Sequence, residues 1–188
     1  MIDDPVRELK VRAEILHHAA STGDARALSR LRALPELKKA ESDALVRAAA
    51  EMKRKHWLAV VAVEAGFVGW EHAKCVLGGD AHDAGFGKLL SGSGRGAFLN
   101  HWFAIYEEAR AVQDELLATG ERRYLLAYQR QCFLTEQGYI ESLGLDPDDA
   151  DWRAIGWDWV RPRSTAARGR LYGKLLLAGR EGGDKTTV

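Results

Sequence analysis

The sequence predicts a mainly α protein, in which an N-terminal bundle of antiparallel helix pairs is followed by an α-rich α+β half with at most a small sheet. Three observations carry this prediction. Apolar residues recur at helical spacing through 1–77. Seven glycines and two serines then occur within 78–96, a composition typical of a linker or mobile loop. Beyond it, 97–159 gathers four of the six tryptophans and four of the five tyrosines.

The first region contains recognisable helix boundaries. Asp4 and Pro5 predict a helix start, because an aspartate caps free N–H groups and proline suits the first helical position. This helix runs until 21–23, where Ser-Thr-Gly stops it. Asp24 predicts the cap of a second helix, which we expect to continue to Pro35.

Three more helices are expected in the rest of the first region. Ser42 or Asp43 begins one, and the basic cluster at 53–55 is predicted to end it, because cations stabilise a helix C-terminus. Residues 56–65 are apolar nearly all round, which predicts a central helix. A short helix is expected over 70–77.

The second half mixes helix and strand signals. Residues 98–105 fit either a strand or the start of a helix, and a helix is expected to follow from Tyr106. The alternation over 122–135 predicts one strand. Short helices are expected over 139–143 and around Trp152, and a basic amphipathic helix over 166–178. The predicted organisation is therefore a helical bundle over 1–77, a Gly-rich connection over 78–96, an α-rich α+β half over 97–180, and a disordered tail over 181–188.

Two short stretches resemble known helical regions. Ala19 to Asp24, followed by Leu28 and Leu31, resembles the opening of an ankyrin-type helix pair. Residues 64–70, Glu-Ala-Gly-Phe-Val-Gly-Trp, are similar to a segment of helical regions that accompany ankyrin repeats in bacterial proteins. The ankyrin Thr-Pro-Leu-His motif and a repeat of about 33 residues are both absent, which disfavours a true array. The resemblance implies stacked helical hairpins of the kind used for protein contacts. The later half resembles uncharacterised bacterial proteins, and that likeness implies no activity.

Charge balance, apolar runs and cysteine content disfavour several classes of protein. Lysine and arginine number 27, as do aspartate and glutamate, so a globally basic nucleic-acid binder is disfavoured. The longest apolar run, 58–63, is too short to cross a bilayer. The first residues are acidic and lack the apolar segment of a secretory signal, and neither Cys75 nor Cys132 belongs to a Cys-x-x-Cys motif. We therefore expect a cytoplasmic protein without a membrane partner.

The sequence offers no metal or cofactor motif. Asp146, Asp148, Asp149 and Asp151 suggest calcium, but the glycine and glutamate that an EF-hand requires are missing. A capped turn is the better interpretation. We therefore predict no metal and no cofactor.

The aromatic stretch supplies candidate residues for a ligand site. Polar side chains that suit hydrogen bonding lie among aromatic rings that suit stacking. The predicted ligand-binding residues are Asn100, His101, Trp102, Tyr106, Glu107, Tyr128, Gln131, Trp157, Asp158 and Arg161.

Three hypotheses for the function follow. The first is a non-catalytic module that binds a protein partner or a small ligand. The second is a small-molecule enzyme, which requires His101, Glu107, Tyr128 and Gln131 to converge in one pocket, with Cys132 as a further candidate. The third is nucleic-acid binding through 161–180, which carries six bases and no acid. This third hypothesis is the least favoured, because 141–158 carries six acids that we expect to dock against those bases. The sequence does not predict an oligomeric state.

Overall fold

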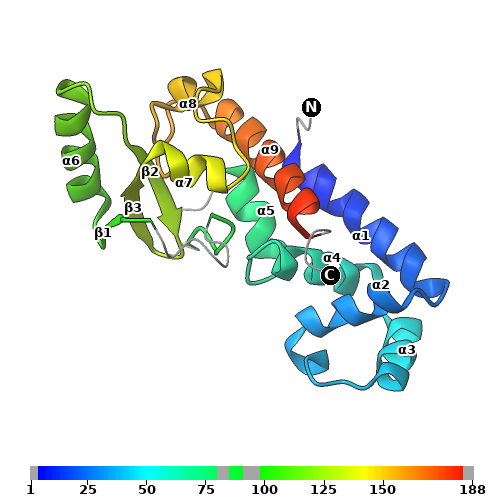
Figure 1. The fold of residues 1–188 in the computed structure, drawn as a ribbon. Coiled ribbons are helices and arrows are strands. Elements are labelled where there is room, and N and C mark those ends of the chain that lie inside the picture. The colour runs from blue at the N-terminus through cyan, green and yellow to red at the C-terminus, as the bar shows by residue number, and fades with distance from the viewer. Residues whose placement is uncertain (1–3, 80–84, 91–97, 184–188) are drawn as a thin grey trace. The chain divides into compact units, whose positions relative to one another are not determined.

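The structure, a computed structural model, describes residues 4–79, 85–90 and 98–183. It confirms the predicted fold class, since helices dominate and the sheet is a small antiparallel one of three strands (Figure 1). The chain divides into two compact units. We call residues 6–75 the helical unit, and residues 76–188 together with 1–5 the sheet unit.

The helical unit is built from short helices. Its elements are α1 (Pro5–Ser21), α2 (Ala25–Arg30), the 3₁₀ turns η1 (Leu31–Ala33) and η2 (Pro35–Leu37), α3 (Ser42–Glu51), α4 (Arg54–Glu64) and the first part of α5 (Trp70–Gly78). The predicted cap at Asp24 is confirmed, because its carboxylate accepts a hydrogen bond of 2.7 Å from the backbone N–H of Ala27. The second helix is shorter than predicted, since α2 ends at Arg30 and the chain continues to Ala33 as a 3₁₀ turn.

The prediction for the basic cluster at 53–55 was wrong. Helix α3 ends at Glu51 and Met52 is extended, so the cluster lies at the start of α4 instead. The physical reason is a cap: Nδ1 of His56 accepts a hydrogen bond of 2.9 Å from the backbone N–H of Lys53. The expected central helix is present as α4, where Trp57 and Val60 are buried.

The sheet unit places helices on both faces of its sheet (Figure 1). Its elements after α5 are β1 (His101–Phe103), α6 (Tyr106–Ala118), β2 (Tyr124–Tyr128), β3 (Gln131–Thr135), α7 (Gln137–Ser142), α8 (Ala150–Ile155) and α9 (Thr165–Gly183). The strand order is β1-β3-β2, with antiparallel pairing throughout. Of the two alternatives left open for 98–105, the structure selects the strand.

The single strand predicted over 122–135 was wrong, because the chain folds there into a β2–β3 hairpin. The turn lies at Gln129 and Arg130, and Gln129 adopts a φ of 53°. The backbone of Phe86 and Gly87, which follows Gly85, forms hydrogen bonds with this turn. The N–H of Phe86 donates to the carbonyl of Gln129 at 2.7 Å, and the N–H of Gln129 donates to the carbonyl of Gly87 at 2.8 Å. Of the rest of the predicted connection, 80–84 and 91–96 lie outside the described residues.

The hairpin sorts side chains onto two sheet faces. One face is covered by α6, where Ala109 packs against a buried cluster. The cluster contains Leu125, Ala127, Cys132, Leu134 and Val160. On the opposite face the ring of Phe133 contacts Tyr139 of α7 and Trp102 of β1, with centroid distances of 5.5 Å and 4.5 Å. Because a turn reverses the chain, Cys132 and Leu134 lie on the face opposite to Tyr124, contrary to the single-strand prediction.

The acidic and basic segments of the sheet unit contact each other, as predicted. Asp149 caps α8, with its carboxylate accepting a hydrogen bond from the N–H of Asp151 at 3.0 Å, which confirms a capped turn. Arg170 of α9 donates to Asp151 at 2.5 Å, and Lys174 donates to Asp149 and Asp151. Helix α9 extends to Gly183, and the end of the predicted tail, 184–188, lies outside the described residues.

Candidate functional site

A recess opens on the α6 face of the sheet, beside the first turn of α6. It has a volume of about 650 Å³. Four segments of the sheet unit contribute to its wall: the loop before β1, the end of β1 with the start of α6, the hairpin turn, and the chain before α9. The lining residues are Gly85, Phe86, Ala104, Ile105, Tyr106, Glu107, Gln129, Arg130, Gln131, Cys132, Val160 and Arg161. We call this the Arg161 recess.

A buried carboxylate, Asp158, holds together the two segments that form one wall of the Arg161 recess. Asp158 is only 2% exposed, and Leu125 of β2 forms a parallel bridge to it. Its Oδ1 accepts hydrogen bonds of 2.9 Å from the N–H groups of Val160 and Arg161, and its Oδ2 accepts one of 2.6 Å from the Tyr106 hydroxyl. These bonds join the N-terminus of α6 to the chain before α9, and they satisfy the polar groups that burial would otherwise leave unpaired.

The charge of Asp158 is influenced by its burial. Burial raises the pKa of Asp158 above its ordinary value, outweighing the lowering effect of the Tyr106 hydrogen bond. Burial also raises the pKa of Tyr106, and the bond to Asp158 raises it further. A cation also lies close to this carboxylate, since Nη1 of Arg110 is 3.6 Å from Asp158 Oδ2. Tyr106 therefore keeps its proton at neutral pH and remains a donor to Asp158.

Arg161 lies at the mouth of the Arg161 recess with its guanidinium over an aromatic ring. Its Cζ is 4.1 Å from the centroid of the Tyr106 ring, and its Nη1 is 2.8 Å from Glu107 Oε1. Asp158 does not pair with the Arg161 guanidinium: it accepts a hydrogen bond from the Arg161 backbone N–H, whereas the guanidinium pairs with Glu107. The backbone is fixed by one carboxylate and the side chain is oriented by a second carboxylate and a ring.

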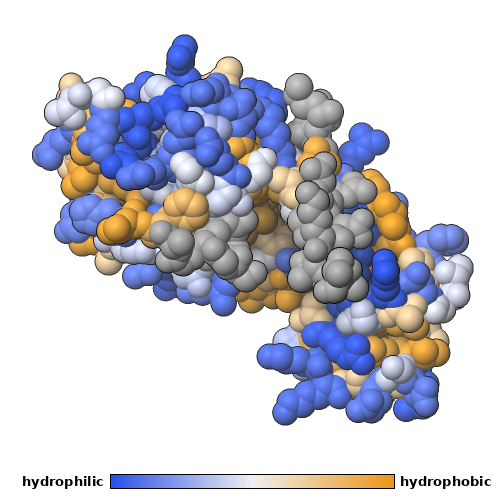
Figure 2. Space-filling model, in the orientation of Figure 1, coloured by the Kyte–Doolittle hydropathy of each residue, from blue (hydrophilic) through white to orange (hydrophobic). Residues whose placement is uncertain are grey.

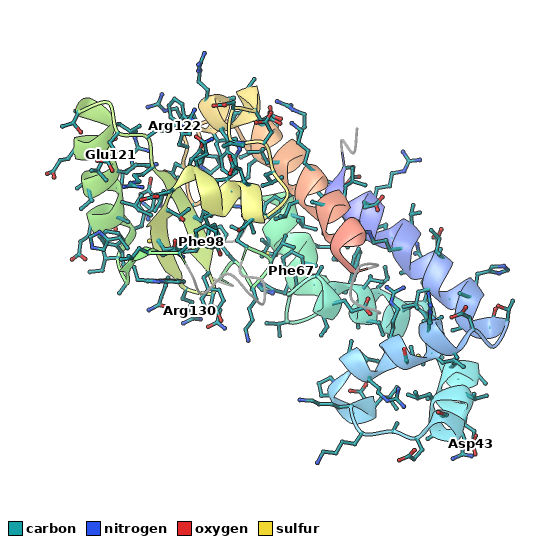
Figure 3. The ribbon with its side chains drawn as sticks, viewed as in Figure 1. Asp43, Phe67, Phe98, Glu121, Arg122 and Arg130 are labelled. Atoms are coloured by element: carbon teal, nitrogen blue, oxygen red, sulfur yellow. The ribbon has the colours of Figure 1, made fainter. Side chains whose placement is uncertain are left out.

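Arg130 contributes a second cation to the wall from the hairpin turn. Figure 3 shows it at the end of the hairpin opposite to Arg122. The two-residue turn and its bonds to 85–87 determine where Arg130 lies. Gly85 has a φ of +72°, and a Cβ at this position would lie 2.8 Å from the carbonyl oxygen of Gln129. Only glycine fits this close approach.

The structure brings together only part of the predicted site. Tyr106, Glu107, Gln131 and Arg161 line the Arg161 recess, and Asp158 lies beneath Tyr106. Trp157 is half-buried with a φ of 53° and contributes its carbonyl to bonds from Gln113 and Leu125. The remaining predicted residues lie elsewhere.

Besides Trp157 and the underlying Asp158, four predicted residues do not line the Arg161 recess. Trp102 and Tyr128 pack edge to face with centroids 5.8 Å apart, on the sheet face opposite to α6. Asn100 is half-buried before β1. His101 stacks beside Phe103 and lines a separate recess of about 380 Å³ near the C-terminal end of α6. The residues named by the enzyme hypothesis therefore do not all line one recess. Glu107, Gln131 and Cys132 line the Arg161 recess and His101 lines the other, whereas Tyr128, the strand partner of Gln131, packs on the sheet face opposite to α6.

Sequence reasoning missed the wall residues supplied by 85–86 and by the turn at 129–130. The glycines around Phe86 are the signal that could have identified the first segment, because paired glycines mark a close backbone approach. The turn has no such signal, since Gln-Arg is not one of the dipeptides that mark hairpins.

Comparisons of the chain with known protein families, with curated proteins and with solved structures find no match. Among the described residues, no group of three or more His, Cys, Asp or Glu side chains is arranged to hold a metal ion. Within 4–79, 85–90 and 98–183, none of the helices combines the length and apolar character needed to cross a membrane.

Proposed function

We propose that the sheet unit is a non-catalytic binding module whose Arg161 recess takes a small, partly apolar molecule with a carboxylate group. The observation that carries this proposal is the guanidinium of Arg161, held over the Tyr106 ring at the mouth of the recess. A planar guanidinium presents a fork of donors that matches a carboxylate in a bidentate arrangement.

The charges of the lining residues favour an anion. Arg130 and Arg161 contribute two cations to the wall, against the single carboxylate of Glu107. The pair between Arg161 and Glu107 is exposed on both sides, and such pairs contribute only about 0–1 kcal/mol. A ligand carboxylate can therefore replace Glu107 at little cost in free energy.

The remaining wall favours an apolar body on the ligand. Phe86 and Val160 pack at the buried cluster beside Cys132, and all three line the recess. The exposed amide of Gln129 offers a donor and an acceptor beside this apolar surface. A few polar groups around an apolar floor is the usual composition of a small-molecule site.

The ionisation of the lining groups supports binding rather than catalysis. Burial raises the pKa of the Cys132 thiol, which keeps it protonated and a poor nucleophile. Tyr106 is committed as a donor to Asp158. His101, the imidazole that the enzyme hypothesis requires, lines the other recess.

The proposal includes a cytoplasmic location, in keeping with Cys75 and Cys132, which are both outside any disulfide. The similarity to ankyrin-associated helical regions of bacteria stays a prediction for the helical unit.

The test is a thermal-shift screen of small carboxylic acids beside their matched primary amides, followed by calorimetry on any acid that stabilises the protein. We expect at least one acid to raise the melting temperature and its amide to have no effect. Arg161→Gln should weaken binding by about tenfold or more, since hydrogen bonds to charged groups contribute about 1.5–3 kcal/mol.

The matched control is Arg153→Gln, which removes the same charge from an exposed position on α8. It should leave affinity unchanged. Equal affinity of the Arg161→Gln variant and the natural chain would reject the proposed site, and a screen in which acids and amides behave alike would reject the ligand class.

A further inference from the structure

Within the part of the chain that the structure describes, the sheet has one open edge. The outer edge of β2 is occupied, because the N–H of Leu125 donates to the carbonyl of Trp157 and the N–H of Trp159 donates to the carbonyl of Leu125, both at 2.8 Å. At the other side of the sheet, no strand of the described residues pairs with the outer edge of β1. Unpaired N–H and C=O groups along such an edge are a template for another strand.

β1 is only three residues long, but the chain around it lacks the charged residues and proline that protect many edge strands. Natural edge strands carry lysine, other charges, proline or a bulge that prevents pairing. Residues 99–105, Leu-Asn-His-Trp-Phe-Ala-Ile, contain no proline and no Asp, Glu, Lys or Arg. Instead, Leu99 is 98% exposed, Ile105 50% and Trp102 46%. Figure 2 shows hydrophobic residues at the surface in the part of the molecule where Figure 1 places β1.

We propose that β1 pairs antiparallel with β1 of a second copy of this chain, around a two-fold axis at Trp102. The sheets of the two copies would then form one continuous sheet. Such a contact is isologous, because both copies use the same surface. In this register His101 lies opposite Phe103 of the partner subunit, and Leu99 lies opposite Ile105 of the partner subunit.

The sequence around Trp102 is what identifies a second copy as the occupant. Aromatic rings stand one residue to each side, at His101 and Phe103, and exposed aliphatic residues stand three residues to each side, at Leu99 and Ile105. Antiparallel self-pairing therefore covers each exposed aliphatic side chain with one from the other copy. Cross-strand apolar and aromatic pairs of this kind stabilise a sheet by about 0.2–1 kcal/mol each.

The charge of the chain permits this contact. Its formal net charge is zero, so two copies approach without long-range repulsion. The pairing also brings Leu99 of the partner subunit beside Ile105, which lines the Arg161 recess. The dimer does not depend on the proposed ligand, and the experiments below need none.

The first test is sedimentation velocity of the full chain over a wide concentration range. We expect the mass to rise from the monomer value of 20.8 kDa to twice that value as concentration increases. Leu99→Lys should weaken dimerisation by about tenfold or more, because it places two ammonium groups in the contact. Its side chain is almost fully exposed, so folding of the monomer should be unaffected. The control is Leu177→Lys, an exposed apolar position on α9.

The second test is Trp102→Cys under oxidising conditions. Residues that face each other across a two-fold in antiparallel strands have Cα atoms about 4.5–5.5 Å apart, which a disulfide can span. We expect a covalent dimer on a non-reducing gel, and none from Leu177→Cys. A monomer at every concentration, or a dimer that Leu99→Lys leaves unchanged, would overturn the proposal.

Discussion

At the scale of single residues, Asp158 determines the geometry of the Arg161 recess. It is buried, and its two oxygens receive three hydrogen bonds from α6 and from the chain before α9. Burial disfavours its charge more than these bonds favour it, so its pKa is raised. A group of this kind contributes stability that is present below its unfolded pKa and is lost as the pH rises through its folded pKa.

We therefore predict how Asp158→Asn changes the pH dependence of unfolding. The unfolded aspartate ionises near its ordinary pKa of about 3.9, whereas the folded one ionises at higher pH. The natural chain should lose free energy of unfolding relative to Asp158→Asn as the pH rises across this interval. Urea denaturation of both proteins at a series of pH values measures the difference. If the free energy of unfolding of the natural chain, minus that of Asp158→Asn, stays constant or increases as the pH rises, the pKa shift is contradicted.

The residue scale also shows what the sequence could predict of the site. Tyr106, Glu107, Asp158 and Arg161 were identified because polar groups stand among aromatic rings, and the structure brings these four together. Other rings in the same stretch serve the core. Trp152 and Trp159 are fully buried with centroids 5.4 Å apart. Composition alone does not separate an aromatic residue that packs in the core from one that lines a recess, because both kinds lie in the same aromatic stretch.

At the scale of elements, the helices were predictable and the hairpin was not. Apolar spacing and caps such as Asp24 specify a helix locally, within a few residues. A hairpin needs a turn signal, and Gln129 and Arg130 supply none. The alternation continues through the turn, so the sequence reads as one strand. A single strand without the turn places Cys132 and Leu134 on the wrong sheet face. The wall of the recess that contains Cys132 was therefore not predicted.

Gly85 provides a prediction about this hairpin. Gly85→Ala should destabilise the protein by about 1–3 kcal/mol, because a Cβ would meet the Gln129 carbonyl oxygen at 2.8 Å and the backbone has a positive φ. The control is Gly169→Ala within α9, where a Cβ meets nothing within 4 Å. That change should be neutral or stabilising by up to about 1 kcal/mol. Chemical denaturation compares the two, and a Gly85→Ala protein as stable as the natural chain would refute the close approach.

The contact between α8 and α9 gives a second prediction at this scale. Although burial alone would raise the pKa of Asp151, hydrogen bonds from Arg170 and Lys174 outweigh it and lower the pKa. A double-mutant cycle of Asp151→Asn and Arg170→Gln should give a coupling of about 1 kcal/mol at neutral pH. This stability is present above the unfolded pKa and is lost as the pH falls through the folded pKa, the opposite sign to Asp158. The exposed pair of Glu14 and Arg54 serves as the control and should show almost no coupling.

At the scale of the whole molecule, the charge distribution argues for internal neutralisation. Acids and bases are equal in number, and the acidic segment 141–158 precedes the basic segment 161–180. Arg170 and Lys174 bond to the acids of α8. Arg168 is buried and donates to the carbonyls of Trp159 and Val160, while Arg161 pairs with Glu107. Four of the six bases in the segment therefore have partners within the sheet unit.

This neutralisation predicts that the chain does not bind nucleic acid through α9. If all six bases of 161–180 contacted phosphates, the affinity for duplex DNA would fall with salt along a log–log slope of about −5. We expect instead no anisotropy change with labelled duplex DNA or with single-stranded RNA, even at low salt. The double variant Asp149→Asn with Asp151→Asn removes the acids that hold Arg170 and Lys174, so it should bind more strongly than the natural chain. Tight, steeply salt-dependent binding by the natural chain would show that these cations remain available to phosphates, and Arg170→Gln would then locate them.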